Sequence, residues 1–216
     1  MIRSEAFLAT VTKLFDIYAT LGKSPSSWNT FLVNLIPKDN DNPTIDKTRP
    51  IALSQIVRRV FERLLLSTWQ DIYSSASVSE CVDVHNFVSP AACNPAHNSG
   101  AEAQNWMSLD PAQGGFRKAH NTITQVLTSD TLCKEGYTIS LFVDYKSAYD
   151  TVNRDIFKRK LRERGTPYHI YRTICSLMLD NTRTYVCVNR QVSNDFIQST
   201  RGFPQGCPLS PLCFIL

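Results

Sequence analysis

The sequence has no long hydrophobic run. No apolar stretch approaches the roughly 20 residues that a helix needs to span a bilayer. Charged residues interrupt the N-terminal stretch MIRSEAFLATVTKLFDIY throughout, which excludes a signal peptide. The seven cysteines are odd in number and lack the close spacing of a disulfide scaffold, so we interpret them as reduced thiols. These absences predict an intracellular protein of the nucleus or cytoplasm, without a membrane partner.

What is present is a globular composition with an uneven distribution of charge. Of the 216 residues, 43% are hydrophobic and 19% are charged, which suits one large domain or two small ones. Residues 1–112 carry nine basic and eleven acidic side chains, whereas residues 113–216 carry fourteen and eight. A basic second half suits a phosphate-bearing partner, because Lys and Arg release counterions when they neutralise phosphates. A solvated basic face would have the same composition.

The first part of the chain predicts two helices and a strand. Apolar spacing predicts a helix over residues 4–21, ended by Gly22, with an inward face of Phe7, Val11, Leu14, Phe15 and Tyr18. FLVNLI (31–36) is typical of a strand, and the polar stretch after it of a hairpin tip or exposed loop. A helix over 52–73 is predicted to turn Val57, Val60, Phe61, Leu64, Leu65, Trp69 and Ile72 inward and Arg58, Arg59, Glu62 and Arg63 elsewhere.

The second part alternates helices and strands after a long polar stretch. Residues 74–112 are aperiodic, and we interpret them as a loop-like insertion. A helix is predicted near 119–133, with Ile123, Val126 and Leu127 on one face, followed by a buried strand in TISLFVD (138–144). Two helices follow, one capped by Asn153 with Ile156, Phe157 and Leu161 inward and Gly165 at its end, the other started by Pro167 with Ile170, Ile174, Leu177 and Met178 inward. TYVCV (184–188) and VSNDFIQ (192–198) predict a hairpin, and the whole is α+β in class.

Asp144 comes at the end of the predicted buried strand. A carboxylate inside a strand would cost several kcal/mol without compensation, whereas at the end of the strand it can face a cleft. The natural compensator there is Mg²⁺, which takes oxygen ligands and often only one or two carboxylates. Tyr149 would lie on the turn after the strand and line the same cleft. The alternative is that Asp144 caps a turn or pairs with Lys146.

Three other segments carry residues suited to phosphates or bases, although each has a plain structural alternative. Lys38 and Arg49 stand at the two ends of the polar turn and could face one phosphate, or be solvated charges. QGGFRKAHNT (113–122) joins glycines, an aromatic and a basic pair, or is a loop before a helix. RGFPQGCPLSP (201–211) places Gln205 among glycines and prolines, or is a turn.

Taken in order, LIPK…RPIAL, QGGFR, FVDYKSAYDTVNR and RGFPQGCPLSPLCF resemble the fingers and palm of a reverse transcriptase. The type it most resembles is that of non-LTR (LINE-like) retrotransposons, with group II intron enzymes as nearer relatives than retroviral ones. The resemblance runs from about residue 28 to the C-terminus, apart from the 74–112 stretch. It implies fingers in residues 1–73 after an N-terminal helix, and the remaining fingers with a partial palm in 113–216.

The resemblance also implies roles for single residues. Asp144 matches a catalytic, metal-binding aspartate, with the carbonyl of Tyr145 as an additional Mg²⁺ ligand. The positions matching nucleotide-binding residues are Lys38, Arg49, Tyr149, Gln205 and Gly206, with Tyr149 at the place of the aromatic that excludes ribonucleotides. The positions near the template path are Gln113, Phe116 and Arg117. The implied partners are an RNA template, a DNA primer and a dNTP, joined by two-metal nucleotidyl transfer.

The family's second acidic pair, usually in a Tyr-x-Asp-Asp turn, does not occur before Leu216, and a thumb is also missing. We therefore expect the sequence to be C-terminally truncated and inactive alone as a polymerase. The alternative function is a non-catalytic nucleic-acid-binding remnant. An unrelated phosphotransferase would need a G-x-x-x-x-G-K-[ST] loop, which is absent. A zinc site from Cys81, His85, Cys93 and His97 is disfavoured by Pro90 and Pro95, which would break a helix.

Overall fold

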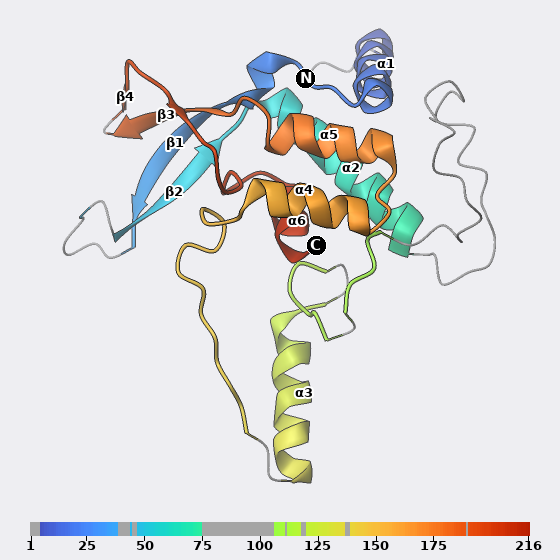
Figure 1. Ribbon diagram of the computed structural model, residues 1–216, viewed down its shortest axis with the longest axis vertical. Helices are drawn as coiled ribbons and strands as arrows, with labels where there is room; N and C mark the ends of the chain where they lie inside the picture. The colour runs from blue at the N-terminus through green and yellow to red at the C-terminus, as the bar shows by residue number, and fades with distance from the viewer. Residues whose placement is uncertain are drawn as a thin grey trace.

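The computed structural model describes residues 5–38, 44, 47–74, 106–110, 112–117, 120–136, 139–188 and 190–216 (Figure 1). The zinc candidates therefore lie outside the described residues. The elements in chain order are α1 (Glu5–Leu21), the 3₁₀ helix η1 (Ser26–Asn29), β1 (Thr30–Pro37), β2 (Thr48–Leu53), α2 (Ile56–Ser74), α3 (Thr122–Glu135), α4 (Arg154–Glu163), α5 (Tyr168–Met178), β3 (Arg183–Val188), β4 (Gln191–Val192), β5 (Ile197–Gln198) and α6 (Ser210–Ile215). Helices and one sheet are mixed, as the α+β expectation requires.

The sheet joins strands from residues 30–53 to strands from residues 183–198. Its order is β2-β1-β3-β4, with β5 also paired to β3. β1 and β2 form an antiparallel hairpin, which favours the hairpin alternative, although the strand β2 itself was not predicted. The pairing of β3 with β4 and β5 confirms the hairpin predicted there. β1 and β3 are parallel, with Leu32 opposite Tyr185. This pairing brings residues far apart in the sequence side by side, and no local pattern predicted it.

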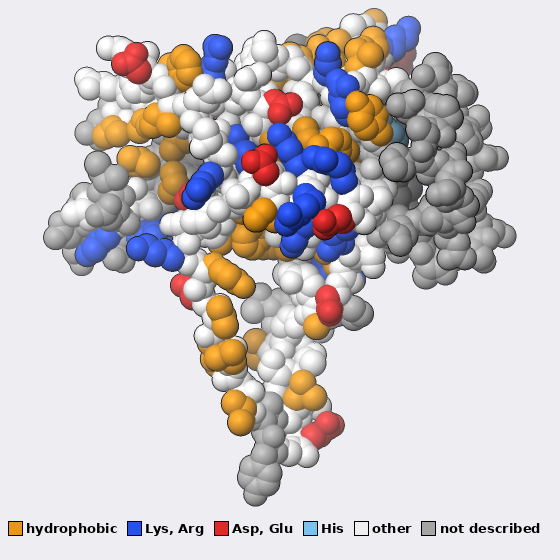
Figure 2. Space-filling model, viewed as in Figure 1, with side chains coloured by type: hydrophobic (Ala, Val, Ile, Leu, Met, Phe, Trp, Pro, Cys, Tyr) orange, Lys and Arg blue, Asp and Glu red, His pale blue; other side chains and the backbone are white. Residues whose placement is uncertain are grey.

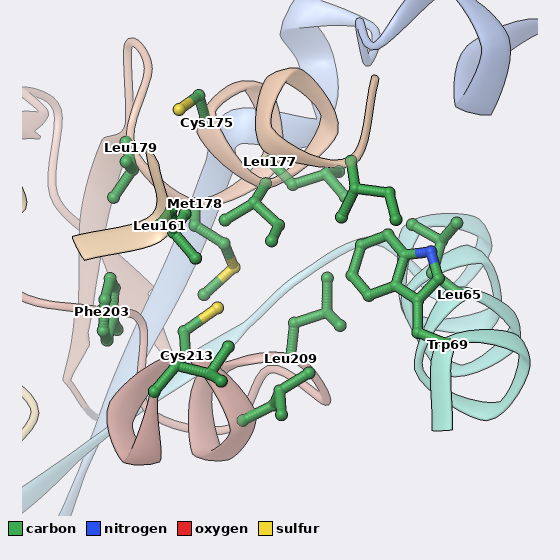
Figure 3. Packing of buried hydrophobic residues seen from close by; sticks show 14 of the residues in the cluster. Leu65, Trp69, Leu161, Cys175, Leu177, Met178, Leu179, Phe203, Leu209 and Cys213 are labelled. Atoms are coloured by element: carbon green, nitrogen blue, oxygen red, sulfur yellow. The ribbon is translucent and has the colours of Figure 1, made fainter. Parts of the chain in front are cut away.

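Apart from α3, the α-helices lie beside the sheet and contribute to one core (Figure 1). Cys213 belongs to α6, and Leu209 immediately precedes this helix. In Figure 3 their side chains point toward those of Leu177 and Met178 on α5. Leu65 and Trp69 of α2 close the same core (Figure 3). The predicted inward residues of α5, Ile170, Ile174, Leu177 and Met178, are all buried.

The end signals of these helices were mostly predicted correctly. The Asn153 side chain accepts hydrogen bonds from the backbone N–H groups of Asp155 and Ile156 at the start of α4. Gly22 and Gly165 both have positive φ, at 61° and 69°, just after α1 and α4. Pro167 is the N-cap of α5 rather than its first helical residue. Ile156, predicted to be inward, is 45% exposed.

The inward face of α2 was predicted wrongly. Phe61, Leu65 and Trp69 are buried as expected, but Val57, Val60 and Leu64 are about half exposed. Arg58 and Glu62, which were placed on the outer face, have no exposed surface. The helix is rotated because the Arg58 guanidinium donates to Glu62 Oε1 and to the backbone carbonyls of Trp28 and Leu177.

The same kind of error concerns α1, although its bounds agree with the prediction. Phe15 is buried, and Val11 and Tyr18 pack partly against the core. Phe7 and Leu14 are 51% and 38% exposed. The aromatic cluster that fixes α1 comes from three elements, because Phe15 lies 5.0 Å from Phe61 and 6.4 Å from Trp28, measured between ring centroids.

The predicted buried strand at 138–144 is also a wrong prediction. Residues 139–145 are extended, belong to no strand and are exposed, with Phe142 at 93%. The helix predicted before it exists as α3, but Ile123, Val126 and Leu127 are 60–72% exposed. Both segments extend away from the helical layer (Figure 1). Neither finds an apolar face to cover it among the described residues, which is why the apolar pattern alone was misleading.

Candidate functional site

The tip of the β1–β2 hairpin gathers positive charge on one face. Ile36 lies opposite Arg49, and the backbone N–H of Lys38 donates to the carbonyl of Lys47 at 2.8 Å. Residues directly opposite in an antiparallel pair share a face, as do residues two apart along a strand. Lys38, Lys47 and Arg49 therefore project from one face, and all three are exposed. Sequence reasoning missed Lys47, which only the register places with the other two.

The loop after β5 lies against the other end of β2. The backbone N–H of Ala52 donates to the carbonyl of Gln205 at 2.7 Å. Gly206 follows with φ 108°, and a Cβ there would stand 3.0 Å from the carbonyl oxygen of Ala52. A small cluster of Phe31, Ala52 and Cys207 buries the contact. The Gly-rich loop is thus held against the same hairpin that carries the basic face.

A second loop, residues 146–153, holds the Gln205 side chain. Its amide nitrogen donates to both carboxylate oxygens of Asp150, each at 3.1 Å. The backbone N–H of Phe203 donates to the carbonyl of Tyr149, and that of Gly202 to the carbonyl of Val152, both at 2.9 Å. The structure therefore brings Tyr149, Gln205 and Gly206 together, as the sequence interpretation required.

The side chain of Tyr149 is partly buried. Its ring lies 5.1 Å from the Phe214 ring, measured between centroids, and burial raises the pKa of its hydroxyl above the ordinary value. The hydroxyl is therefore neutral near pH 7. Tyr149 presents a fixed aromatic surface rather than a charge.

Arg154 joins these loops to the core, a role that sequence reasoning missed. Its guanidinium donates to the carbonyls of Gly202 at 3.1 Å, Leu179 at 2.9 Å and Ser199 at 2.6 Å. Burial lowers the pKa of Arg154, and the nearby Asp180 charge opposes that shift. Its position immediately after the Asn153 cap gave no signal of this role, because the three carbonyls come from distant parts of the chain.

Asp144 and Tyr145 are not brought into this cluster by any hydrogen bond or ion pair among the described residues. Both lie on the extended segment, where Tyr145 is 71% exposed. Their carboxylate and carbonyl oxygens are hard donors of the kind that Mg²⁺ accepts. However, no group of three or more His, Cys, Asp or Glu suited to a metal occurs in the part of the chain that the structure describes. Among the described residues the set of metal ligands is therefore incomplete.

The loop of Gln113, Phe116 and Arg117 forms a separate unit. Arg117 donates to the carbonyls of Asp110 at 3.1 Å and Gln113 at 3.2 Å, so its guanidinium holds the loop itself. Phe116 has φ 58° and is 60% exposed. Just upstream, inside the predicted insertion, Trp106 is buried in the core against Trp69.

A family model described as "Reverse transcriptase (RNA-dependent DNA polymerase)" matches residues 36–216, which is most of the chain. The chain therefore belongs to the reverse transcriptase family. A search among curated proteins found no match.

Family membership carries several general properties. Reverse transcriptase domains bind a nucleic-acid template, a primer and a dNTP, and use divalent metal ions. The match therefore supports the polymerase interpretation over a non-catalytic remnant or an unrelated phosphotransferase. None of the described helices is both long and apolar enough to cross a membrane.

Proposed function

We propose that the chain is part of the RNA-directed DNA polymerase of a non-LTR retrotransposon that acts inside the cell and depends on Mg²⁺. The observation that supports this best is the hairpin register, which puts Lys38, Lys47 and Arg49 on one face. Three cations there would neutralise most of the charge of a triphosphate, and an Arg can bind a phosphate through two parallel hydrogen bonds. The proposal includes fingers in residues 1–73, and the remaining fingers with a partial palm in residues 113–216.

In this proposal, the loop of Gln205 and Gly206 supports the incoming nucleotide. Gln205 is held at its backbone by Ala52 and at its side chain by Asp150. A positioned amide of this kind keeps one geometry, which favours catalysis by orientation. Tyr149 presents its ring at the same loop and would discriminate against a 2′-hydroxyl. Gln113 and Phe116 would lie near the template.

Asp144 would supply one carboxylate to Mg²⁺, with the carbonyl of Tyr145 beside it. The remaining ligands would come from the nucleotide phosphates and from carboxylates that are not among the described residues. A bound metal would stabilise charge that develops on the reacting phosphates. One carboxylate cannot hold two metal ions, so we expect residues 1–216 alone to give no templated synthesis.

The test is RNA-templated primer extension by the product of the longest open reading frame that contains these residues. We expect Asp144→Asn to abolish extension, because an amide is a poor Mg²⁺ ligand. Lys38→Gln and Arg49→Gln should each raise the KM for dNTP about tenfold or more, the value of a lost charge-assisted hydrogen bond. Lys13→Gln, an exposed cation on α1, is the matched control and should change nothing. Extension by Asp144→Asn at the normal rate would refute the proposal.

A further inference from the structure

A cavity of about 440 Å³ lies on elements that the candidate site does not use. Its walls come from the end of α1, η1, α4 and α5, and its charged lining residues are Lys23, Lys158, Arg172 and Asp180. Cavities of a few hundred Å³ hold ligands of nucleotide size. The hairpin tip and the Gln205 loop do not contribute to it.

The cavity carries three cations against one carboxylate. Lys23 and Lys158 form no ion pair or hydrogen bond within the described part of the chain. Arg172 donates to the Tyr168 hydroxyl at 3.2 Å, a neutral partner, and Asp180 is the only carboxylate among the lining residues of the cavity that acts on its charge. Asp180 is the single opposing group, and its charge also acts on Arg154. The unbalanced positive charge favours an anionic ligand.

The floor of the cavity is fixed by uncharged groups. The backbone N–H of Ser24 donates to Ser176 Oγ at 2.8 Å, and the two hydroxyl oxygens lie 2.9 Å apart. The amide nitrogen of Asn29 donates to the carbonyls of Ser176 and Asp180, at 2.9 and 2.7 Å. The segments that carry Lys23 and Asp180, which follow α1 and α5, are therefore held in place without a ligand.

Gly22 lets α1 come close enough to form the wall. Its φ is 61°, and a Cβ there would stand 2.5 Å from Arg172 Cβ. Any other residue would separate the end of α1 from α5. Lys23 and Arg172 thus converge because of a contact that glycine alone permits.

The cavity opens onto a basic surface. Figure 2 shows Lys and Arg side chains gathered over α4 and α5, with a few acidic side chains among them. The stretch 158–164 supplies Lys158, Arg159, Lys160, Arg162 and Arg164. Among these, Arg159 pairs with Glu163 at 3.6 Å on the exposed surface, and Arg164 donates to the carbonyls of Trp106 and Ser108, at 3.4 and 2.8 Å. These cations would neutralise several phosphates of a polyanion that lies across α4. A single small anion would need only the cations of the cavity.

We propose that this cavity binds a phosphate group of a single-stranded RNA lying across α4 and α5, at a site separate from the polymerase site. Lys23, Lys158 and Arg172 neutralise the phosphate, and Ser24 and Ser176 supply hydroxyls beside it. Asp180, the one carboxylate in the lining, weakens the binding because it repels the phosphate. The site recognises backbone charge and carries no information about base sequence.

The test is fluorescence anisotropy of a fluorescein-labelled oligouridylate without dNTP or metal, titrated with the protein at several salt concentrations. Lys158→Gln should weaken binding and reduce the slope of log K against log salt by about 0.7, the value for one phosphate contact on a single strand. Asp180→Asn should tighten binding. Lys160→Gln lies on the same helix but outside the cavity, so it should have a clearly smaller effect.

Equal losses for Lys158→Gln and Lys160→Gln would overturn the proposal, because they would indicate a diffuse basic surface. An Asp180→Asn variant that binds no tighter would also count against it. Competition by uridine 5′-monophosphate separates the two sources of phosphate. Displacement of the RNA by the nucleotide at equal phosphate concentration would show that the cavity binds a free nucleotide. It would refute the proposal that the cavity binds single-stranded RNA. The Lys38 and Arg49 variants should leave this binding unchanged, so the two proposals can fail separately.

Discussion

At the scale of single residues, the buried pair of Arg58 and Glu62 ties three parts of the chain together. Arg58 reaches Glu62 on its own helix at 2.5 Å, the carbonyl of Trp28 at 2.6 Å and that of Leu177 at 2.6 Å. Its guanidinium carbon also lies 4.5 Å from the centroid of the Phe31 ring. Burying these charges is costly, so the pair fixes the rotation of α2 more than it adds to stability.

Arg58→Ala should therefore destabilise the protein by about 3–5 kcal/mol, because it leaves Glu62 buried without its counter-charge. Urea unfolding monitored by circular dichroism measures the change. Arg59→Ala, the exposed neighbour, should stay within about 0.5 kcal/mol. Replacing both partners, as Arg58→Met with Glu62→Leu, should cost less than Arg58→Ala alone. A double variant that is less stable than Arg58→Ala would show that the charges themselves stabilise the fold.

Cys207 gives a second prediction at this scale. Burial first, and then the Glu62 charge, raise its thiol pKa from 9.0 to about 12. The folded protein keeps a proton that the unfolded chain releases above about pH 9, so stability should fall as the pH rises from there toward about 12. Urea unfolding across this range should show a shallower decline for Cys207→Ala. Parallel declines in the two proteins would contradict the assignment.

At the scale of elements, the contact between the 149–152 turn and the 201–206 loop depends on Gly202. Its φ is 76°, and a Cβ would stand 2.8 Å from backbone atoms of Tyr149 and Asp150. Gly202→Ala should cost about 2 kcal/mol or more, since both the backbone conformation and the contact are lost. Gly136→Ala is the matched control, because nothing lies within 4 Å of its Cβ position. Equal unfolding midpoints for the two variants would refute the argument.

Elements with local signals were predictable, and those that depend on distant partners were not. Asn153, Gly22 and Gly165 mark helix ends through their own backbones, so a short stretch of sequence contains the whole cause. The 138–144 run has the composition of a buried strand, but burial requires a partner strand that composition cannot supply. The burial of Arg58 likewise depends on carbonyls 30 and 119 positions away.

Hydrogen exchange tests the correction for residues 139–145. Their amides have no strand partner in the part of the chain that the structure describes, so they should exchange near the unprotected rate. Amides of α5, whose residues Ile174 and Leu177 are fully buried, should be protected by orders of magnitude. Strong protection across 139–145 in the isolated protein would mean that the segment pairs after all, for example with a second copy.

At the scale of the whole molecule, the candidate site was predicted as a set of residues but not as an arrangement. Lys38, Arg49 and Gln205 were proposed from the sequence. The structure places all three at one hairpin, with Lys38 and Arg49 near its tip and Gln205 against Ala52 at the other end of β2. Arg154 and Lys47 could not be found, because their importance comes from pairings that form only in the folded chain. Asp144 was singled out at the end of a predicted buried strand and then through a resemblance. The structure shows no strand there and Asp144 is exposed, so the first argument is lost.

The folded unit is also larger than the segment that the family model matches. The match begins at residue 36, near the end of β1, yet Phe15, Trp28 and Phe31 are all buried before that point. Trp28 lies 5.4 Å from Phe61 between ring centroids, and its carbonyl receives Arg58. β1 is also the only strand that joins β2 to β3 in the described sheet.

Residues 36–216 alone should therefore fail to fold cooperatively. Removing the first 35 residues takes away three large core side chains, each worth about 1.5–3 kcal/mol of burial, and most of the central strand. A loss of that size approaches the whole stability of a typical domain. A chain that begins at Glu5 keeps all these groups and serves as the control. Urea unfolding of both proteins decides the matter: a sigmoidal transition with the same m-value for residues 36–216 would show that the N-terminal segment is an accessory rather than part of the core.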